Sequence, residues 1–172
     1  MVRRQGPVLV DTNVILECWR VNAWNALSGG YGVETVEDCV IETQTGYQRR
    51  REEQRVEQAV LAASLRAVHK VGKAELAGVL LRDPLAANLD HGERSLWAHA
   101  VGRADAWVLC GPDKASLRFG VRLGLRDRLV ALERLLSDAG HKAGSVLREN
   151  YTSKWLDRIL GEMVMSEGAK RK

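Results

Sequence analysis

The sequence lacks the features that mark membrane and secreted proteins. None of its apolar runs reaches the roughly 18 residues that a membrane-spanning helix needs. Two arginines near its start are followed by no apolar stretch of the signal-peptide kind. Only three cysteines occur among 172 residues, too few and too scattered for a disulfide framework or a zinc knuckle. We therefore expect a cytoplasmic protein without membrane association, whose cysteines are small buried apolar side chains.

Two common catalytic motifs are missing as well. The pair Gly72-Lys73 lacks the preceding glycine and the following Ser or Thr of a phosphate-binding P-loop. No strand-to-helix turn of the nucleophile-elbow type is present either. The formal net charge of +4 is compatible with a nucleic acid partner but is common among ordinary domains.

What the sequence does contain is a pair of short apolar runs that each end near an aspartate. Val8-Leu9-Val10 leads directly into Asp11, and a run over residues 106–110 is closed by Gly111-Pro112-Asp113. In open α/β sheets, ligands bind just outside the carboxyl ends of the strands. The two aspartates are therefore predicted to lie where a binding site would be built.

Strands and helices are predicted to alternate along the chain. Short apolar runs predict strands over residues 8–11, 31–36, 67–71 and 106–110. Helical spacing of apolar residues predicts helices over residues 13–27, 37–47, 56–65, 74–81, 90–100, 114–123 and 129–136, with a last helical patch at 155–160. This alternation is typical of an α/β fold with a largely parallel sheet. The charged segment 48–58 is expected to be a solvated loop or helix face, or alternatively a phosphate-contacting patch.

Four acidic residues occupy positions that such a fold would bring together. Asp11 and Asp113 follow strands, Glu93 lies in the first turn of a helix, and Glu42 follows an apolar triplet. Carboxylates without His or Cys partners offer only oxygen ligands, which favours Mg²⁺ or Mn²⁺ over zinc. Such an ion activates a water molecule and neutralises charge on a phosphoryl group. Each carboxylate alone could instead cap a helix, close a turn or lie on a solvated face.

Four neighbours of this acidic set have two interpretations each. Thr12 and Asn13 could hydrogen-bond Asp11 and so support the metal site, or serve the start of the following helix. Lys114 and Arg118, one helical turn apart, could contact an RNA phosphate or be ordinary surface charges.

Three segments resemble the motifs of PIN-domain ribonucleases. Residues 8–16, Val-Leu-Val-Asp-Thr-Asn-Val-Ile-Leu, resemble the opening motif of that family. Residues 92–98 resemble the Gly-Glu helix of one branch, and residues 105–115 resemble the late strand that leads to the last acidic position. The resemblance covers about residues 7–136.

This resemblance implies a fold, an activity and partners. The fold is a PIN-like three-layer α/β/α sandwich with a central, mainly parallel sheet over residues 1–140, followed by a partly helical C-terminal extension over residues 141–172. The activity is Mg²⁺- or Mn²⁺-dependent endoribonucleolytic hydrolysis of RNA phosphodiester bonds, commonly by the VapC-like toxin of a toxin–antitoxin pair. The partners to expect are RNA, an antitoxin protein and, as an open option, a second copy of the chain.

Carried over by position, the catalytic and metal-binding set is Asp11, Glu42, Glu93 and Asp113. The second member stays open, because Glu37 and Asp38 lie close to Glu42. Glutamate stands at position 93 where many members have aspartate, and its longer side chain could change the metal geometry.

Two other functions compete with this interpretation. One is a PIN-like module that binds RNA or protein without cleaving, although such a scaffold has no reason to concentrate negative charge near phosphate. The other is a structure-selective DNA nuclease, although the chain is short for the helical additions that grip a duplex.

Overall fold

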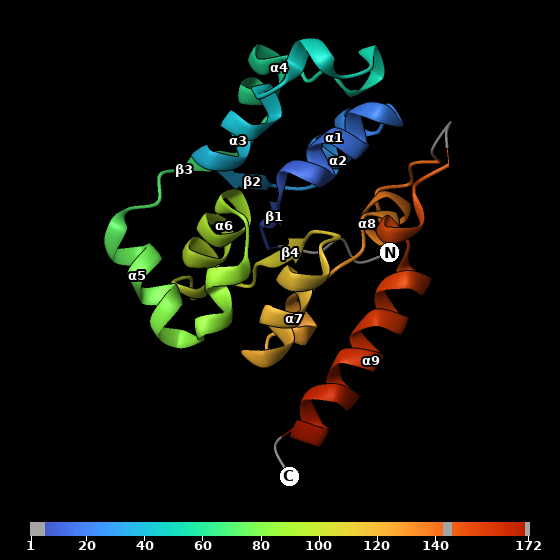
Figure 1. Ribbon diagram of the computed structural model, residues 1–172. Coiled ribbons are helices and arrows are strands. Elements are labelled where there is room, and N and C mark those ends of the chain that lie inside the picture. The colour runs from blue at the N-terminus through green and yellow to red at the C-terminus, as the bar shows by residue number, and fades with distance from the viewer. Residues whose placement is uncertain (1–5, 143–145, 171–172) are drawn as a thin grey trace.

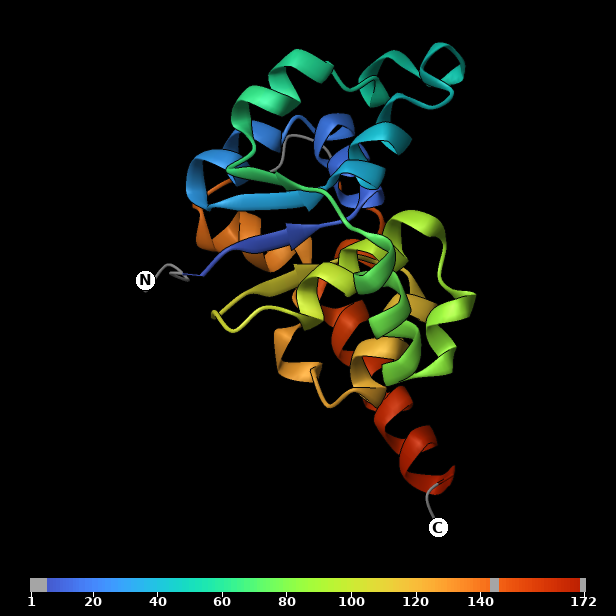
Figure 2. The same ribbon diagram turned by 90° about the vertical axis from the view of Figure 1, so that its left-hand side faces the viewer.

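The computed structural model describes residues 6–142 and 146–170. A four-stranded parallel sheet lies between two layers of helices, so the fold is the predicted three-layer α/β/α sandwich (Figure 1). Its strands are β1 (Val8–Val10), β2 (Val33–Val36), β3 (Ala67–His69) and β4 (Val108–Cys110). Their order in the sheet is β3-β2-β1-β4, and Figure 2 shows all four arrows pointing the same way. All carboxyl ends therefore meet at one edge of the sheet.

Alternating side chains of the strands build two separate cores. Val8 and Val10 belong to one core, whereas Leu9 between them belongs to the other, as the period of two in a strand requires. Four helices cover the face of Val8: α1 (Thr12–Arg20), α2 (Trp24–Gly30), α4 (Gln58–Ser64) and α8 (Leu132–Asp138). Four others cover the face of Leu9: α5 (Lys73–Arg82), α6 (His91–Val101), α7 (Lys114–Arg122) and α9 (Ser153–Lys170). Helix α3 (Glu37–Gln44) lies between the layers, because Cys39 enters the second core and Val40 packs against the first.

Several predicted boundaries were wrong. The helix predicted over residues 13–27 is two helices, because the backbone turns at residues 21–23 and Asn22 adopts a φ of 54°. The helix predicted over residues 129–136 begins at Leu132, since Leu129 is still extended and forms a parallel bridge with Leu109 of β4. Helix α3 ends at Gln44, before the predicted residue 47, and the last helix extends well beyond the predicted patch.

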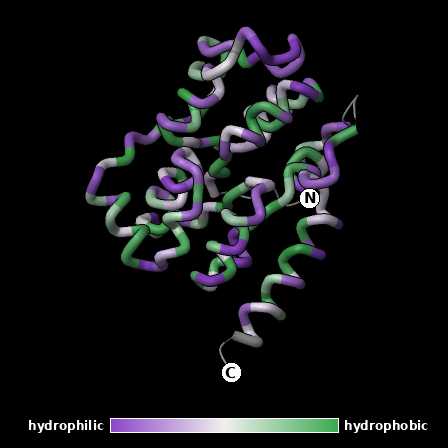
Figure 3. Tube along the Cα trace, viewed as in Figure 1, coloured by the Kyte–Doolittle hydropathy of each residue, from purple (hydrophilic) through white to green (hydrophobic). Residues whose placement is uncertain are grey.

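The charged segment between α3 and α4 forms two short 3₁₀ turns, Tyr47–Arg49 and Glu52–Gln54. Figure 3 shows this segment as a hydrophilic stretch at the outside of the molecule. Arg50 holds it in place by donating to the backbone carbonyl oxygens of Glu42 and Thr43 at the end of α3. The segment is thus a solvated turn region anchored beside Glu42.

The C-terminal helix is integrated into the second core. Trp155, Ile159 and Met163 of α9 are buried there, and α9 packs on α7. Residues 143–145 and 171–172 of the predicted extension lie outside the described residues. None of the described helices is long and apolar enough to cross a membrane. The three cysteines are buried and unpaired, as predicted.

Candidate metal centre

The candidate centre lies at the carboxyl edge of the sheet, where several elements end or begin. Asp11 follows β1 and caps α1, Glu42 lies on α3, and Glu93 lies in the first turn of α6. A small cavity of about 70 Å³ opens between these elements. Its lining residues are Asp11, Thr12, Asn13, Glu42, Asp90 and Glu93. Three of the four predicted acidic residues thus meet in one cavity.

Asp11 is the most deeply buried of these carboxylates. One of its oxygens accepts the backbone N–H of Val14 at 2.8 Å, which caps α1. Its other oxygen, Oδ2, is buried without any hydrogen-bond partner. A buried oxygen of this kind is costly in free energy unless a donor or a cation reaches it. Asp11 therefore leaves a strong acceptor unused at the end of a central strand.

The electrostatics of the cavity favour a bound cation. Burial raises the pKa of Asp11 to about 7, the Val14 N–H partly opposes this, and the charges of Asp90, Asp113 and Glu42 add to it. Burial also raises the pKa of Glu93 to about 8, and the charges of Asp113, Asp90 and Asp11 raise it further. A divalent ion would replace this mutual repulsion by attraction.

The structure places Glu42, rather than Glu37 or Asp38, in the cavity. The Glu42 carboxylate accepts the Thr12 hydroxyl at 2.7 Å and the Gly92 backbone N–H at 3.0 Å. Asp38 instead accepts the hydroxyl of Ser95 on α6, and Glu37 is exposed.

Gly92 permits the close approach of α3 and α6. A Cβ at position 92 would lie 2.6 Å from Oε2 of Glu42, far inside van der Waals contact. The Gly-Glu pair at the start of α6 therefore has two roles. The glycine makes room for one carboxylate of the cavity, and Glu93 contributes another.

The four residues that were predicted to support the acidic set lie in different environments. Thr12 supports Glu42 rather than Asp11, and its hydroxyl also lies 3.3 Å from the carbonyl oxygen of Cys39. Asn13 is exposed at the rim of the cavity. Lys114 is exposed at the start of α7, whereas Arg118 forms an ion pair with Glu167 of α9 at 3.2 Å. Of the two basic residues, Lys114 is therefore the more accessible from solvent.

One cavity residue was missed at the level of the sequence. Asp90 lines the cavity, caps α6 by accepting the Glu93 backbone N–H at 2.8 Å, and raises the pKa of both Asp11 and Glu93. Its position as the first residue of the helix predicted over residues 90–100 was the available signal, because an aspartate at a helix start commonly caps it. Asp113 caps α7 in the same way and acts on the cavity through its charge, although it is not among the lining residues.

The cavity carboxylates are not drawn into a closed cage. In the described part of the chain, no group of three cavity carboxylates has three oxygen atoms, one from each, that all lie within 4.8 Å of one another. Such spacing suits Mg²⁺ or Mn²⁺ held by one or two carboxylates together with several water molecules. The oxygen-only donor set and the unpaired Oδ2 atom of Asp11 fit the same ions.

No family model, curated protein or solved structure matches the chain. The capacity of the site must therefore be judged from its own chemistry. A partly buried group of carboxylates has the hard oxygen ligands that a divalent ion requires. It offers no cysteine or histidine nucleophile among the residues that line the cavity.

Proposed function

We propose that the chain is a Mg²⁺- or Mn²⁺-dependent endoribonuclease. The observation that carries this proposal is the buried Oδ2 atom of Asp11, which has no hydrogen-bond partner although its residue lines an acidic cavity. An oxygen in that position is well suited to coordinate a hard cation.

In this proposal, each acidic residue has a distinct task. Asp11 and Glu93 bind the ion directly, because burial makes them the carboxylates that gain most from a cation. Glu42 is oriented by the Thr12 hydroxyl and the Gly92 N–H, and it helps position a water ligand. Asp90 and Asp113 add negative charge that raises the affinity for the cation. The bound ion supplies an activated water molecule and offsets charge on the scissile phosphate.

A nucleic acid substrate is supported by the basic segment that Arg50 anchors beside Glu42. Arg49 and Arg51 flank this anchor and are exposed, so they are available to contact phosphates of a bound nucleic acid. The preference for RNA over DNA follows from the resemblance to PIN-domain ribonucleases. So does the role of toxin in a toxin–antitoxin pair, with an antitoxin as partner.

The decisive test is Asp11→Asn. Asparagine keeps the cap on Val14 but removes the charge, so we expect cleavage of single-stranded RNA to fall at least about 1000-fold. The thermal unfolding midpoint should not decrease. Asp157→Asn is the matched control, since Asp157 is exposed on α9 and should leave cleavage unchanged. Wild-type cleavage by a folded Asp11→Asn protein would overturn the assignment.

Metal dependence and substrate class are tested in the same assay. EDTA should abolish cleavage, Mg²⁺ or Mn²⁺ should restore it, and a zinc-selective chelator should have no effect. Cleavage in EDTA would exclude the proposed metal site. A DNA oligonucleotide of the same sequence should resist cleavage, and cleavage of DNA alone would favour a DNA nuclease instead.

The proposed toxin role has its own test. Expression of the wild-type chain should slow growth, and Asp11→Asn should relieve this effect. Co-expression of an adjacent gene should also relieve it and yield a complex that co-purifies. Ile41, 62% exposed on α3 and adjacent to Glu42 in the chain, offers such a partner an apolar contact. Unimpaired growth with soluble wild-type protein would instead indicate a housekeeping nuclease.

A further inference from the structure

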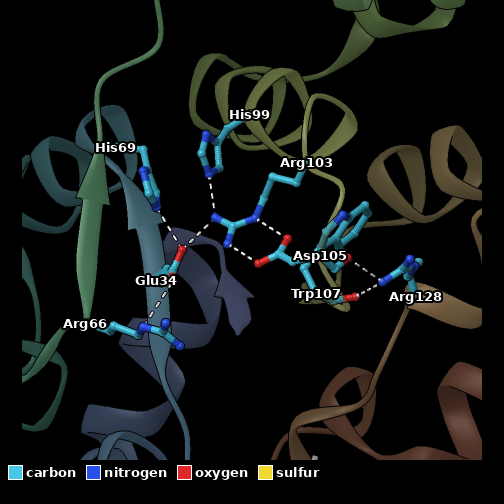
Figure 4. Close-up of polar contacts among 8 residues, drawn as sticks. All are labelled: Glu34, Arg66, His69, His99, Arg103, Asp105, Trp107 and Arg128. Carbon is cyan, nitrogen blue, oxygen red and sulfur yellow. Dashed lines mark hydrogen bonds and ion pairs between the residues drawn. The ribbon is translucent and has the colours of Figure 1, made fainter. Parts of the chain in front are cut away.

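A second cluster of chemically active side chains lies on the Leu9 face of the sheet, away from the acidic cavity. Glu34 of β2, His69 of β3 and His99 of α6 bring one ligand atom each within 4.8 Å of one another. Figure 4 shows these side chains converging from three different elements. His99 lies six residues beyond Glu93 on α6, about 9 Å farther along the helix axis. The cluster is therefore a separate site.

Glu34 supplies a buried negative charge where the sheet would ordinarily carry an apolar side chain. Its exposed fraction is only 4%, and its neighbours Val33 and Val36 are fully buried. Burial would raise its pKa, but hydrogen bonds from His69 at 2.8 Å and from Arg103 at 2.7 Å hold that pKa below the usual range. Glu34 is thus ionised and ready to act as an oxygen ligand.

The two histidines present nitrogen atoms to the same space. Their rings stack with centroids 3.8 Å apart and an interplanar angle of 19°. In Figure 4, His69 directs a ring nitrogen toward the carboxylate of Glu34, and His99 directs one toward the guanidinium of Arg103. Two imidazoles and one carboxylate form a ligand set typical of Zn²⁺ and related transition metals.

His99 is held in the form that a metal requires. Its Nε2 lies 2.9 Å from an Arg103 nitrogen, and a guanidinium can only donate. His99 Nε2 is therefore an acceptor with its lone pair directed into the cluster. Burial, together with the charges of His69 and Arg103, also lowers the pKa of His99.

Arg103 occupies the position that a metal cation would take, and it has a second partner. Its guanidinium donates to the two carboxylate oxygens of Asp105 at 2.9 and 2.6 Å. Because the guanidinium is planar and rigid, Arg103 and the partly exposed Asp105 would move together when the nitrogen between Glu34 and His99 is displaced, which keeps these two bonds. The cluster can therefore exchange an internal cation for an external one without leaving Arg103 unpaired.

We propose that Glu34, His69 and His99 bind a transition metal ion of the Zn²⁺ class, which displaces the guanidinium of Arg103. Water completes the coordination. His69 Nε2 donates to Glu34 in the metal-free state, so binding releases that proton or transfers it to Nδ1. The ion would tie the edge strand β3 to β2 and α6. This proposal is independent of the nuclease activity.

The test is a titration of untagged, metal-free protein with Zn²⁺ by calorimetry and with Co²⁺ by visible absorption. Excess Mg²⁺ is included, because it competes for the oxygen-only cavity and not for imidazoles. We expect one site whose Co²⁺ spectrum reports mixed nitrogen and oxygen ligands. His69→Gln and His99→Gln should each weaken binding by more than about 100-fold. His91→Gln, which removes an exposed histidine 3.1 Å from Asp38, is the matched control and should not change it.

The variant Arg103→Gln separates a metal site from an ion-pair network. Removing the competing cation should tighten Zn²⁺ binding by about 10-fold or more. Absence of binding to the wild-type protein would overturn the proposal, even if Arg103→Gln alone bound the ion. Binding that survives both His69→Gln and His99→Gln would overturn it as well. Circular dichroism confirms that each variant is folded, and the titration of the wild-type protein tests the proposal without any variant.

Discussion

The acidic cavity and the Glu34 cluster bury carboxylates to a similar degree but surround them with opposite charges. Asp11 and Glu93 lie among other carboxylates, and their pKa values rise to about 7 and about 8. Glu34 accepts bonds from Arg103 and His69, and its pKa falls below the usual range. The first region needs a cation from outside, whereas the second already contains one. Burial alone therefore does not determine the role of a carboxylate in this protein.

The largest expected effect is on the free energy of unfolding. Replacing a carboxylate by an amide should change it in opposite directions in the two regions. Glu34→Gln should lower the free energy of unfolding by about 3 kcal/mol, because it leaves the largely buried charge of Arg103 with Asp105 as its carboxylate partner. Asp11→Asn should raise that free energy by about 1 to 2 kcal/mol near neutral pH, because it removes an unpaired charge and keeps the cap. Urea unfolding of the two variants measures both values, and a change of the same sign in each would contradict the comparison.

A smaller effect should appear in the pH dependence of stability. The pKa values of Asp11 and Glu93 are raised from 3.8 and 4.5, so the folded protein retains protons that the unfolded chain has released. In the metal-free protein, the contribution of these two groups to the free energy of unfolding should therefore be greatest below about pH 4. That contribution is lost progressively as the pH rises from about 4 to about 8, above which both groups are deprotonated in the folded protein as well.

Mg²⁺ should reverse this trend, because it binds the deprotonated carboxylates. The increase in unfolding midpoint that Mg²⁺ produces should grow across the same pH range, and Glu93→Gln should reduce it. Glu34 cannot cause this behaviour, since its lowered pKa affects stability only in acid. Thermal unfolding with and without Mg²⁺ at several pH values measures the effect. A pH-independent shift would show that Asp11 and Glu93 are not the ligands.

The contact between Gly92 and Glu42 should matter least for stability and more for activity. Gly92→Ala introduces a Cβ 2.6 Å from Oε2 of Glu42, so the carboxylate must turn away from the cavity. We expect RNA cleavage to fall about 10-fold while stability changes by less than about 1 kcal/mol. Gly78→Ala on α5 is the matched control, because a Cβ there meets nothing within 4 Å. Equal activity of the two variants would show that the position of the Glu42 carboxylate does not affect cleavage.

Much of the architecture could be predicted because its signals are local. The strand ending at Asp11 and the strand before Asp113 were marked by short apolar runs, and the short strand over residues 67–69 lies within its predicted range. The break between α1 and α2 was not predicted. Cys18 and Trp24 on either side of Asn22 face the same core, so their helical spacing continues across the turn.

Local signals in the sequence were sufficient to predict the alternation of elements, the parallel sheet and the position of Asp11 at its carboxyl edge. Which carboxylates meet there depends on the folded chain, because Asp90 and Glu42 join Asp11 from α6 and α3 through contacts between distant segments. The same holds for Glu34 and His69, which are 35 residues apart yet hydrogen-bonded at 2.8 Å. Apolar periodicity is a property of neighbouring residues in the chain. The pKa of a carboxylate and its capacity to bind a metal depend instead on atoms within a few ångströms in space, and folding alone brings these together.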